Sequence, residues 1–351
     1  MKILCLIGIA MLLCLGAGAQ TNSYTVTPII DNTQDPNLVN PWGLSRPIRA
    51  SIPENEWWTS DNVTGVTTLY SADKSGIQSM SPLVITIPTA MGIGTGSPTG
   101  TAYNPGNGPG PGPNNFAFAT LDGTISNWNA GELPSQPQGG CLDCHVGSAT
   151  VKVNNFAKGA SYTGLTIATN PTTRSSAYYA ANNNGRVEAY DAATFAPVPL
   201  TGRFTDPMIP AGYRAYGIQA VGARIWVTFF NGIAGGFVDA FDANGIRKVR
   251  LAQGSFSEPW GIVQAPANFG AFSNMLLIGN VSSGFIAAFD PNTGAFKGFL
   301  NDANGNPITL PGLWGLSFGN GSKKSGPVNT LYYAAGGVDE LTGVFGAITA
   351  N

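Results

Sequence analysis

The residues best suited to chemistry form the motif Cys141-Leu-Asp-Cys144-His145, in which two thiols three positions apart precede a histidine. This C-x-x-C-H spacing is typical of covalent haem c attachment, because the two thiols can bond one porphyrin and the adjacent imidazole can bind its iron. The whole chain contains one histidine. The motif therefore predicts one covalent haem c, held by Cys141 and Cys144, with His145 as iron ligand.

A small disulfide loop explains the same residues. Two nearby thiols pair readily in an oxidising compartment, and the motif lies in a glycine- and proline-rich stretch at about 131–148 that offers few apolar residues to cover a porphyrin. Zinc is the poorer alternative, since two cysteines and one histidine leave a fourth ligand unaccounted for. Haem attachment and a disulfide between Cys141 and Cys144 both stay open.

A second candidate site rests on aromatic residues that recur before a repeated glycine. If the repeats present these rings equivalently, they gather at one end of the molecule with two polar residues nearby. An aromatic, sparsely charged funnel suits a sugar or another neutral ligand, although rings at such positions can also simply pack between neighbouring repeats. The predicted ligand-binding residues are Asn40, Trp42, Tyr216, Glu258, Trp260 and Trp314.

No complete catalytic set is visible. The segment Gly315-Leu-Ser317-Phe-Gly319 matches the serine hydrolase elbow, but it falls inside a predicted strand and not at a strand-to-helix turn. A propeller lactonase or lyase would need converging carboxylates, and the candidates are scattered along the chain: Asp61, Asp122, Glu258 and Asp339. The sequence therefore favours a protein that is not an enzyme.

The repeats themselves predict the fold. A short element with glycine at its centre occurs six times, at Gly43, Gly100, Gly164, Gly217, Gly261 and Gly315. Each element precedes a segment that alternates like a strand, turns and alternates again, and a fourth short strand usually follows, as at Leu83–Ile87 or Lys248–Leu251. Six four-stranded antiparallel units of this length predict an all-β, single six-bladed β-propeller.

The two ends of the chain suggest how the ring closes. The sixth unit has room for only three strands, whereas Tyr24–Ile30 alternates like a strand before the first unit. We expect this N-terminal strand to become the outer strand of the last blade, because closure of a ring protects sheet edges.

The N-terminus predicts export. Lys2 precedes an apolar run and the small residues Ala17-Gly-Ala19, which is the pattern of a cleaved signal peptide over residues 1–19. The propeller then occupies residues 20–351, and the mature protein is secreted or periplasmic. Charged residues are 10% of the chain and the net charge is −2, so nothing indicates nucleic acid binding or membrane insertion.

Several segments carry a resemblance to known proteins. The unit from Glu258-Pro-Trp-Gly261 to Asp290-Pro-Asn-Thr-Gly294 resembles an NHL-type propeller repeat. Nearly the whole mature chain is similar to an uncharacterised family of exported bacterial propeller proteins, through Asp35–Gly43, Phe204–Tyr213, Ala265–Asn274 and Gly312–Asn320. The resemblance implies a fold and a compartment, and it implies no activity.

Together these features favour an exported binding or scaffolding propeller whose loop face recognises a small ligand, a polymer or a protein. A monohaem electron-transfer protein that uses the C-x-x-C-H motif is the first alternative. A lactonase- or lyase-type enzyme is the second.

Overall fold

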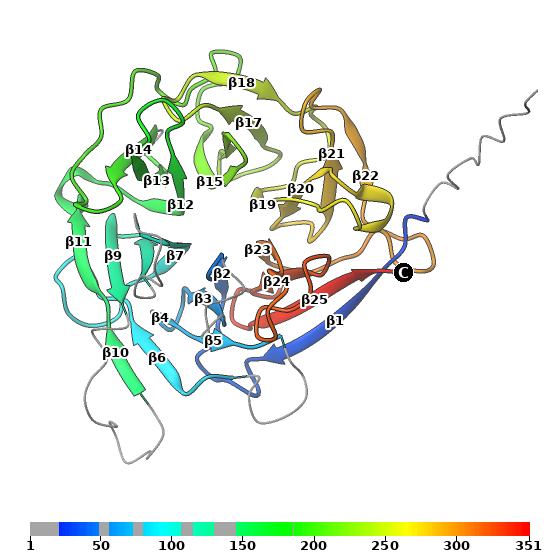
Figure 1. The fold of residues 1–351 in the computed structure, drawn as a ribbon, viewed down its shortest axis with the longest axis horizontal. Helices are drawn as coiled ribbons and strands as arrows, with labels where there is room; N and C mark the ends of the chain where they lie inside the picture. Colours follow the sequence, from blue (N-terminus) through cyan, green and yellow to red (C-terminus); the bar gives the residue numbers. More distant parts are fainter. Residues whose placement is uncertain (1–20, 49–55, 73–79, 107–114, 130–144, 185) are drawn as a thin grey trace, which may run out of the picture.

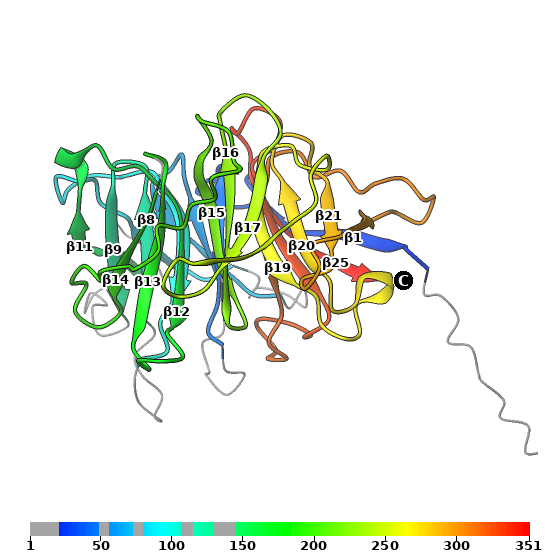
Figure 2. The same cartoon turned by 90° about the horizontal axis from the view of Figure 1, so that it is seen from above.

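The computed structural model describes residues 21–48, 56–72, 80–106, 115–129, 145–184 and 186–351. Its described strands form six small sheets that stand in a ring around a central axis (Figure 1). Figure 2 shows the ring from the side, with the strands of each sheet running between its two faces. The prediction of an all-β, six-bladed propeller is confirmed.

Blades 1 to 3 follow the order of the sequence, with the inner strand of each sheet first in the chain. Blade 1 contains β2 (Pro41–Ser45), β3 (Trp57–Asp61), β4 (Val66–Thr67), β5 (Leu69–Tyr70) and β6 (Leu83–Thr86). Blade 2 contains β7 (Pro98–Tyr103), β8 (Asn115–Thr120), β9 (Thr124–Asn129) and β11 (Thr150–Asn154). Blade 3 contains β12 (Tyr162–Thr169), β13 (Ser176–Asn182) and β14 (Arg186–Asp191).

Blades 4 to 6 each contain four described strands. Blade 4 contains β15 (Arg214–Val221), β16 (Arg224–Phe230), β17 (Phe237–Phe241) and β18 (Arg247–Arg250). Blade 5 contains β19 (Pro259–Gln264), β20 (Leu276–Asn280), β21 (Ile286–Phe289) and β22 (Phe296–Phe299). Blade 6 contains β23 (Leu313–Phe318), β24 (Leu331–Ala335), β25 (Val344–Ala350) and β1 (Tyr24–Asp31).

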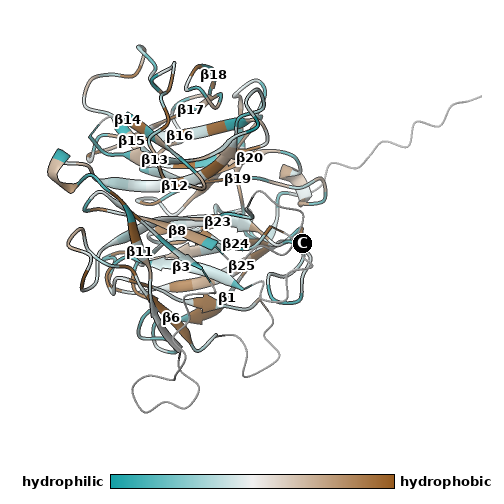
Figure 3. Cartoon of the chain, turned by 60° about the vertical axis from the view of Figure 1, so that its left-hand side comes forward, coloured by the Kyte–Doolittle hydropathy of each residue, from teal (hydrophilic) through white to brown (hydrophobic). Residues whose placement is uncertain are grey.

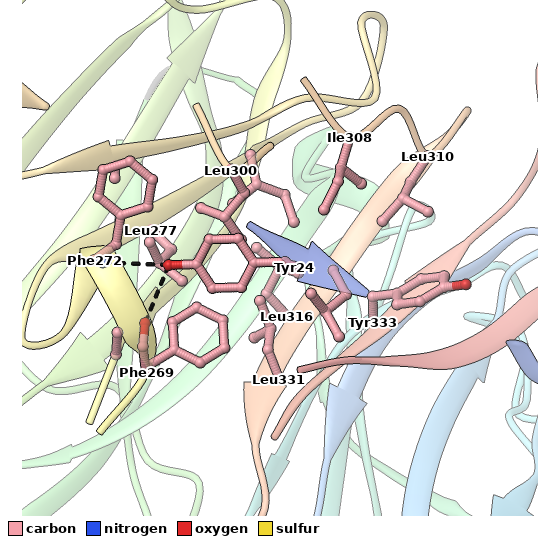
Figure 4. Packing of buried hydrophobic residues seen from close by; sticks show 14 of the residues in the cluster. Tyr24, Phe269, Phe272, Leu277, Leu300, Ile308, Leu310, Leu316, Leu331 and Tyr333 are labelled. Carbon is pink, nitrogen blue, oxygen red and sulfur yellow. Dashed lines mark hydrogen bonds between the residues drawn. The ribbon is translucent and has the colours of Figure 1, made fainter. Parts of the chain in front are cut away.

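The predicted closing strand lies where the sequence placed it. β1 pairs antiparallel with β25, from Tyr24 opposite Ala350 to Asp31 opposite Val344. The side chain of Tyr24 also reaches blade 5, where its hydroxyl donates to Phe269 O at 3.1 Å and accepts from Phe272 N at 3.2 Å (Figure 4). The N-terminal strand thus joins the last two blades.

The insertion at about 131–148 ends in a strand that the sequence did not predict. Its described residues form β10 (His145–Ser148), which pairs in parallel with β6 at the outer edge of blade 1, with His145 opposite Leu83. The chain then continues directly into β11 of blade 2. The insertion therefore adds a strand to one blade before it returns to the next, which sequence repetition could not show.

The hydrophobic core lies between neighbouring blades. Trp58 of blade 1 stacks on Phe116 of blade 2, with ring centroids 4.1 Å apart, and equivalent clusters fill the other five interfaces. Apolar residues, drawn in brown, lie along strands such as β1 and β6 (Figure 3). Aromatic side chains from neighbouring blades therefore interdigitate, and this packing explains why so many aromatic residues are buried in this chain.

The repeated glycines are required where adjacent inner strands approach each other. A Cβ on Gly217 would lie 2.3 Å from Trp260 O, one on Gly261 would lie 2.4 Å from Trp314 O, and one on Gly315 would lie 2.8 Å from Trp42 O. The other three motif glycines meet the next blade's backbone in the same way: Gly43, Gly100 and Gly164. Each glycine is therefore the contact through which one blade packs on the next.

Candidate functional site

The structure brings together the four aromatic residues that the sequence singled out. Trp42 and Trp314 stack with centroids 3.7 Å apart, and Trp260 meets the ring of Trp314 edge-on at 5.8 Å. Tyr216 lies 6.3 Å from Trp42 and 6.2 Å from Trp314. These four rings contact one another across the axis, and we call them the aromatic plug.

A local irregularity in the inner strands directs these rings inward. The pairing register shifts between Pro41 and Leu44, and the same shift occurs in the inner strands of blades 4, 5 and 6. Each shift contains the aromatic residue and the motif glycine. A bulge of this kind bends the strand and changes the direction of a side chain, so the repeated ring-glycine pair both packs the blades and builds the plug.

Hydrogen bonds fix two of the indoles. Trp260 Nε1 donates to Thr163 O of blade 3 at 2.8 Å, across the axis. Trp314 Nε1 donates to Asn40 Oδ1 at 2.8 Å. Trp42 Nε1 is buried and has no partner among the described residues. Trp42, Trp260 and Trp314 are 1% to 9% exposed, so within the described part of the chain these rings pack on one another and do not line an open aromatic funnel.

The axis below the plug is nearly filled. The cavity there has a volume of about 20 Å³, and its walls include Gly43, Gly100, Gly261 and Gly315. That volume is about what one water molecule needs. Among the described residues, this cavity is too small to hold a substrate.

Glu258 is the best-positioned polar group at the plug. Its backbone has a φ of 59°, a left-handed conformation that is uncommon for a non-glycine residue. The backbone is held because Glu258 N donates to Gly235 O at 3.0 Å and Val281 N donates to Glu258 O at 2.9 Å. The carboxylate accepts from the Tyr216 hydroxyl at 2.8 Å and from Ser282 Oγ at 2.6 Å. Burial and the neighbouring Glu258 raise the pKa of Tyr216, which stays a hydrogen-bond donor.

Sequence reasoning missed a second carboxylate, Glu340. It lies in the loop between β24 and β25, and its Oε2 accepts from Asn40 Nδ2 at 3.0 Å. Burial raises the pKa of Glu340, the hydrogen bond from Asn40 opposes the rise, and the charge of Glu258 adds to it. The sequence had drawn attention to Asp339 instead, whose carboxylate accepts from Leu341 N at 3.2 Å. Asp339 and Glu340 are adjacent in the same loop, and no repeat pattern distinguishes them.

The other channel carboxylates do not join this pair. Asp61 is fully buried inside blade 1, where burial raises its pKa well above the usual range and Thr68 Oγ1 donates to it at 2.7 Å. Asp122 accepts from Ala90 N at 2.5 Å in blade 2. Within the described part of the chain, no three histidine, cysteine or acidic side chains come together as a metal site.

The C-x-x-C-H motif is only partly placed. Cys141 and Cys144 lie outside the described residues, and His145 is the first residue of β10. Haem attachment and a disulfide therefore both stay predictions. The proposed signal peptide, residues 1–19, also lies outside the described part, and among the residues that are described no helix is long and apolar enough to cross a bilayer.

Comparisons with known sequences give relatives without an assigned activity. No family model matches the chain. An uncharacterised protein of Acanthamoeba polyphaga mimivirus is 27% identical over 214 residues, which cover 57% of this chain and 37% of that protein. A second uncharacterised protein of the same virus is 23% identical over 331 residues and covers 90% of this chain and 76% of the relative. The chain thus spans little more than a third of the first relative and about three quarters of the second.

Solved structures with similar folds are distant in sequence. The PQQ-bound aldose sugar dehydrogenase of Streptomyces coelicolor gives a TM-score of 0.55 at 12% identity, over 94% of this chain and all of that one. A structure described as glucose dehydrogenase gives 0.56 at 13% identity, over 93% and 99%. At such identities the likeness shows the propeller fold alone.

Proposed function

We propose that this chain is an exported, non-catalytic binding propeller that uses the face above the aromatic plug. We use the name acidic rim for the carboxylates of Glu258 and Glu340 together with the groups of Asn40, Tyr216 and Ser282 that donate hydrogen bonds to them. The observation that carries the proposal is the closed axis, where rings fill the space in which a buried substrate would otherwise bind. Recognition must then occur on a surface, and the rim holds the polar groups closest to the plug.

The chemistry of the rim favours a cationic ligand. Glu258 and Glu340 are close enough that the charge of one raises the pKa of the other, and an ammonium or guanidinium group would relieve that repulsion. Carboxylate oxygens also form their strongest hydrogen bonds with charged donors. We infer that the partner is a protein or polymer that presents lysine- or arginine-like groups.

Binding can be followed through the plug itself, because its indoles lie directly beneath the rim. We expect a tetralysine peptide to change the intrinsic tryptophan fluorescence in a saturable way, and a neutral cello-oligosaccharide to have no effect. The variants Glu258→Gln and Glu340→Gln should each weaken tetralysine binding by about tenfold. Asp339→Asn is the matched control, since it removes a charge from the same loop without touching the rim.

Two results would overturn the proposal. Equal weakening by Asp339→Asn and Glu340→Gln would mean that only net charge matters. Turnover of a lactone panel, or oxidation of aldoses in the presence of added PQQ, would make the chain an enzyme. The second assay is chosen because the similar solved structures are a PQQ-bound aldose sugar dehydrogenase and a glucose dehydrogenase.

Export and family membership belong to the same proposal. They are supported by the signal-peptide pattern of residues 1–19 and by the segments that resemble exported bacterial NHL-like propellers. N-terminal sequencing of the protein recovered outside the cytoplasm tests export, and an intact Met1 would count against it.

The C-x-x-C-H spacing supports a second candidate, a monohaem electron-transfer protein. Covalent haem would supply one-electron redox chemistry, with Cys141 and Cys144 as attachment points and His145 as iron ligand. The protein exported from a host with cytochrome c maturation should then show a Soret band and the mass of one haem. A mass lower by two hydrogens and no Soret band would show a disulfide instead.

A further inference from the structure

Two adjoining cavities lie at the junction of blades 2 and 3, where β11 and β14 face the outside of the ring (Figure 1). One has a volume of 460 Å³ and the other of 430 Å³, both within the range of ordinary ligand pockets. Lys152 and Phe195 line both cavities, so the two hollows meet at these side chains. β11 of blade 2 supplies Lys152, and the turn after β14 of blade 3 supplies Phe195.

The main chain of β14 is closed beneath the first cavity. Val187 and Ala189 are each 4% exposed. The segment that follows pairs beside them, since Val198 N donates to Ala189 O at 2.8 Å and Asp191 N donates to Ala196 O at 2.8 Å. A ligand at this junction must therefore be held by side chains, and the exposed side chains that line the cavities decide its chemistry.

The first cavity carries an excess of positive charge. Three exposed cationic side chains line it: Lys152, Lys158 and Arg186. Glu188 is the carboxylate in the same lining, and Arg186 Nε already binds its Oε1 at 2.7 Å. No described residue forms an ion pair with Lys152 or Lys158. Because ammonium groups form strong hydrogen bonds with carboxylates, the two lysines suit an anionic ligand.

The second cavity is polar, and Lys152 is the charged residue of its lining. Three asparagines line it: Asn104, Asn115 and Asn127. Asn115 Oδ1 accepts from Asn127 Nδ2, which leaves the Asn115 Nδ2 donors without a partner among the described residues. Thr194 of the same lining is exposed. Amides and hydroxyls are donors and acceptors for the hydroxyl groups of a sugar, so this cavity suits a carbohydrate.

Phe195 occupies a position that blade 5 gives to glycine. Phe195 N donates to Asp191 O at 2.9 Å in the turn after β14, and Gly294 N donates to Asp290 O at 2.9 Å in the turn after β21. Both residues have a positive φ, 58° at Phe195 and 76° at Gly294. This left-handed conformation is easy for glycine and strained for a bulky residue. Blade 3 therefore keeps an aromatic ring where the backbone favours glycine, at the place where the two cavities meet.

The ring of Phe195 is only partly covered by the protein. It stacks on Tyr178, with ring centroids 5.3 Å apart and planes inclined by 17°, and it stays half-buried. The rest of its surface lines the two cavities. The C–H face of a pyranose ring is apolar and can pack on an aromatic surface of this kind.

We propose that the junction of blades 2 and 3 binds an acidic oligosaccharide, a chain of uronate sugars. Its carboxylates meet Lys152 and Lys158, one of its rings packs on Phe195, and its hydroxyls accept from Asn115. Each unit of such a chain combines a carboxylate, hydroxyls and an apolar ring face, which is the mixture that the two cavities present. The site shares no residue with the acidic rim, so the two proposals can fail independently.

Titration calorimetry with defined oligomers tests the ligand class. We expect a hexamer of galacturonate or of mannuronate to bind with a measurable Kd, because each carries one carboxylate per ring. The methyl ester of the hexamer that binds should bind at least tenfold more weakly, since it keeps the rings and loses the charges. Hexaglutamate should also bind at least tenfold more weakly, since it keeps the charges and lacks the rings.

Variants of the protein test the site. Lys152→Gln combined with Lys158→Gln should weaken the binding of the uronate hexamer at least tenfold, and Lys297→Gln on the exposed surface of β22 should leave its Kd unchanged. Both lysines of the double variant are exposed, so its thermal unfolding midpoint should stay at the wild-type value. Phe195→Gly should weaken the hexamer about tenfold, because it removes the ring and leaves the residue that the same turn has in blade 5.

Several outcomes would overturn the proposal. Failure of both uronate hexamers to bind would exclude the ligand class. Equal binding of hexaglutamate, or displacement of the hexamer by an equal concentration of inorganic phosphate, would mean a site for anions in general. Unchanged binding by the double lysine variant or by Phe195→Gly would place the oligosaccharide elsewhere on the protein.

Discussion

The indole of Trp42 lies flat on the indole of Trp314, with ring centroids 3.7 Å apart and planes inclined by 15°. Trp42 belongs to the first blade and Trp314 to the last, so this contact joins the two ends of the ring at its axis. β1 joins the same end of the ring at its circumference, through its pairing with β25. Residues far apart in the sequence thus close the ring at two places: Trp42 and Trp314 at the axis, and β1 and β25 at the circumference.

Removal of the inner contact should destabilise the whole propeller. Trp314 is 1% exposed and donates to Asn40, so Trp314→Ala should lower the free energy of unfolding by about 3–5 kcal/mol, the usual loss for a buried tryptophan. Trp314→Phe should lose less, because it keeps a ring against Trp42. Urea unfolding followed by circular dichroism measures both, and a loss below about 1 kcal/mol for the alanine variant would show that the plug does not stabilise the ring.

The motif glycines should tolerate alanine according to the space available. Gly217→Ala would place a Cβ 2.3 Å from Trp260 O, whereas Gly164→Ala would place one 3.0 Å from Tyr216 O. Overpacking against backbone typically costs about 1–3 kcal/mol, so Gly217→Ala should be the more destabilised of the two. Thermal unfolding of both variants checks the order, and equal midpoints would contradict it.

The buried hydroxyl of Tyr24 contributes to the outer closure. Tyr24→Phe removes the donor to Phe269 O and leaves Phe272 N–H without its acceptor (Figure 4). An unsatisfied buried group costs about 1–3 kcal/mol, and we expect a loss of that size in urea unfolding. Tyr333→Phe is the matched control, because Tyr333 lies in the same core cluster and its hydroxyl is drawn away from these bonds. Similar losses in both variants would assign the effect to the core in general.

Blade 4 should make stability depend on pH. Burial raises the pKa of Asp239 from 3.8 to about 6, Arg250 opposes the rise, and the neighbouring Asp206 adds to it. Because the folded state holds this proton more tightly than the unfolded chain, the contribution is fully present below about pH 4 and is lost as pH rises through about 6. Each pKa unit corresponds to about 1.4 kcal/mol.

The variant Asp239→Asn isolates that contribution. It keeps an acceptor for Arg250 and removes the titration, so the fall in stability between pH 4 and pH 7 should be smaller than in the wild type. Chemical unfolding at several pH values measures the difference. An unchanged slope would place the titration on another group, such as the buried Asp61 of blade 1.

The sequence by itself determined the architecture. Six glycines, five of them next to an apolar or aromatic residue and each followed by alternating strands, predicted the number of blades. Every blade meets its neighbour through the same backbone contact and must repeat the same residue there. Tyr24–Ile30 was recognisable as the closing strand for a related reason, since the sixth unit lacked a strand and the ring could not close without one. These features could be predicted because equivalent positions in every blade have the same surroundings and therefore select similar residues.

Only the tertiary structure showed how the four aromatic rings fill the centre of the propeller. Sequence identified Trp42, Tyr216, Trp260 and Trp314 but could not say whether four rings around an axis leave a funnel or fill it, because that depends on the radius of the ring and on the bulge that turns each side chain inward. It also missed Glu340, because this residue lies in a nonrepeating loop, and its approach to Asn40 and Glu258 of other blades leaves no periodic pattern in the sequence.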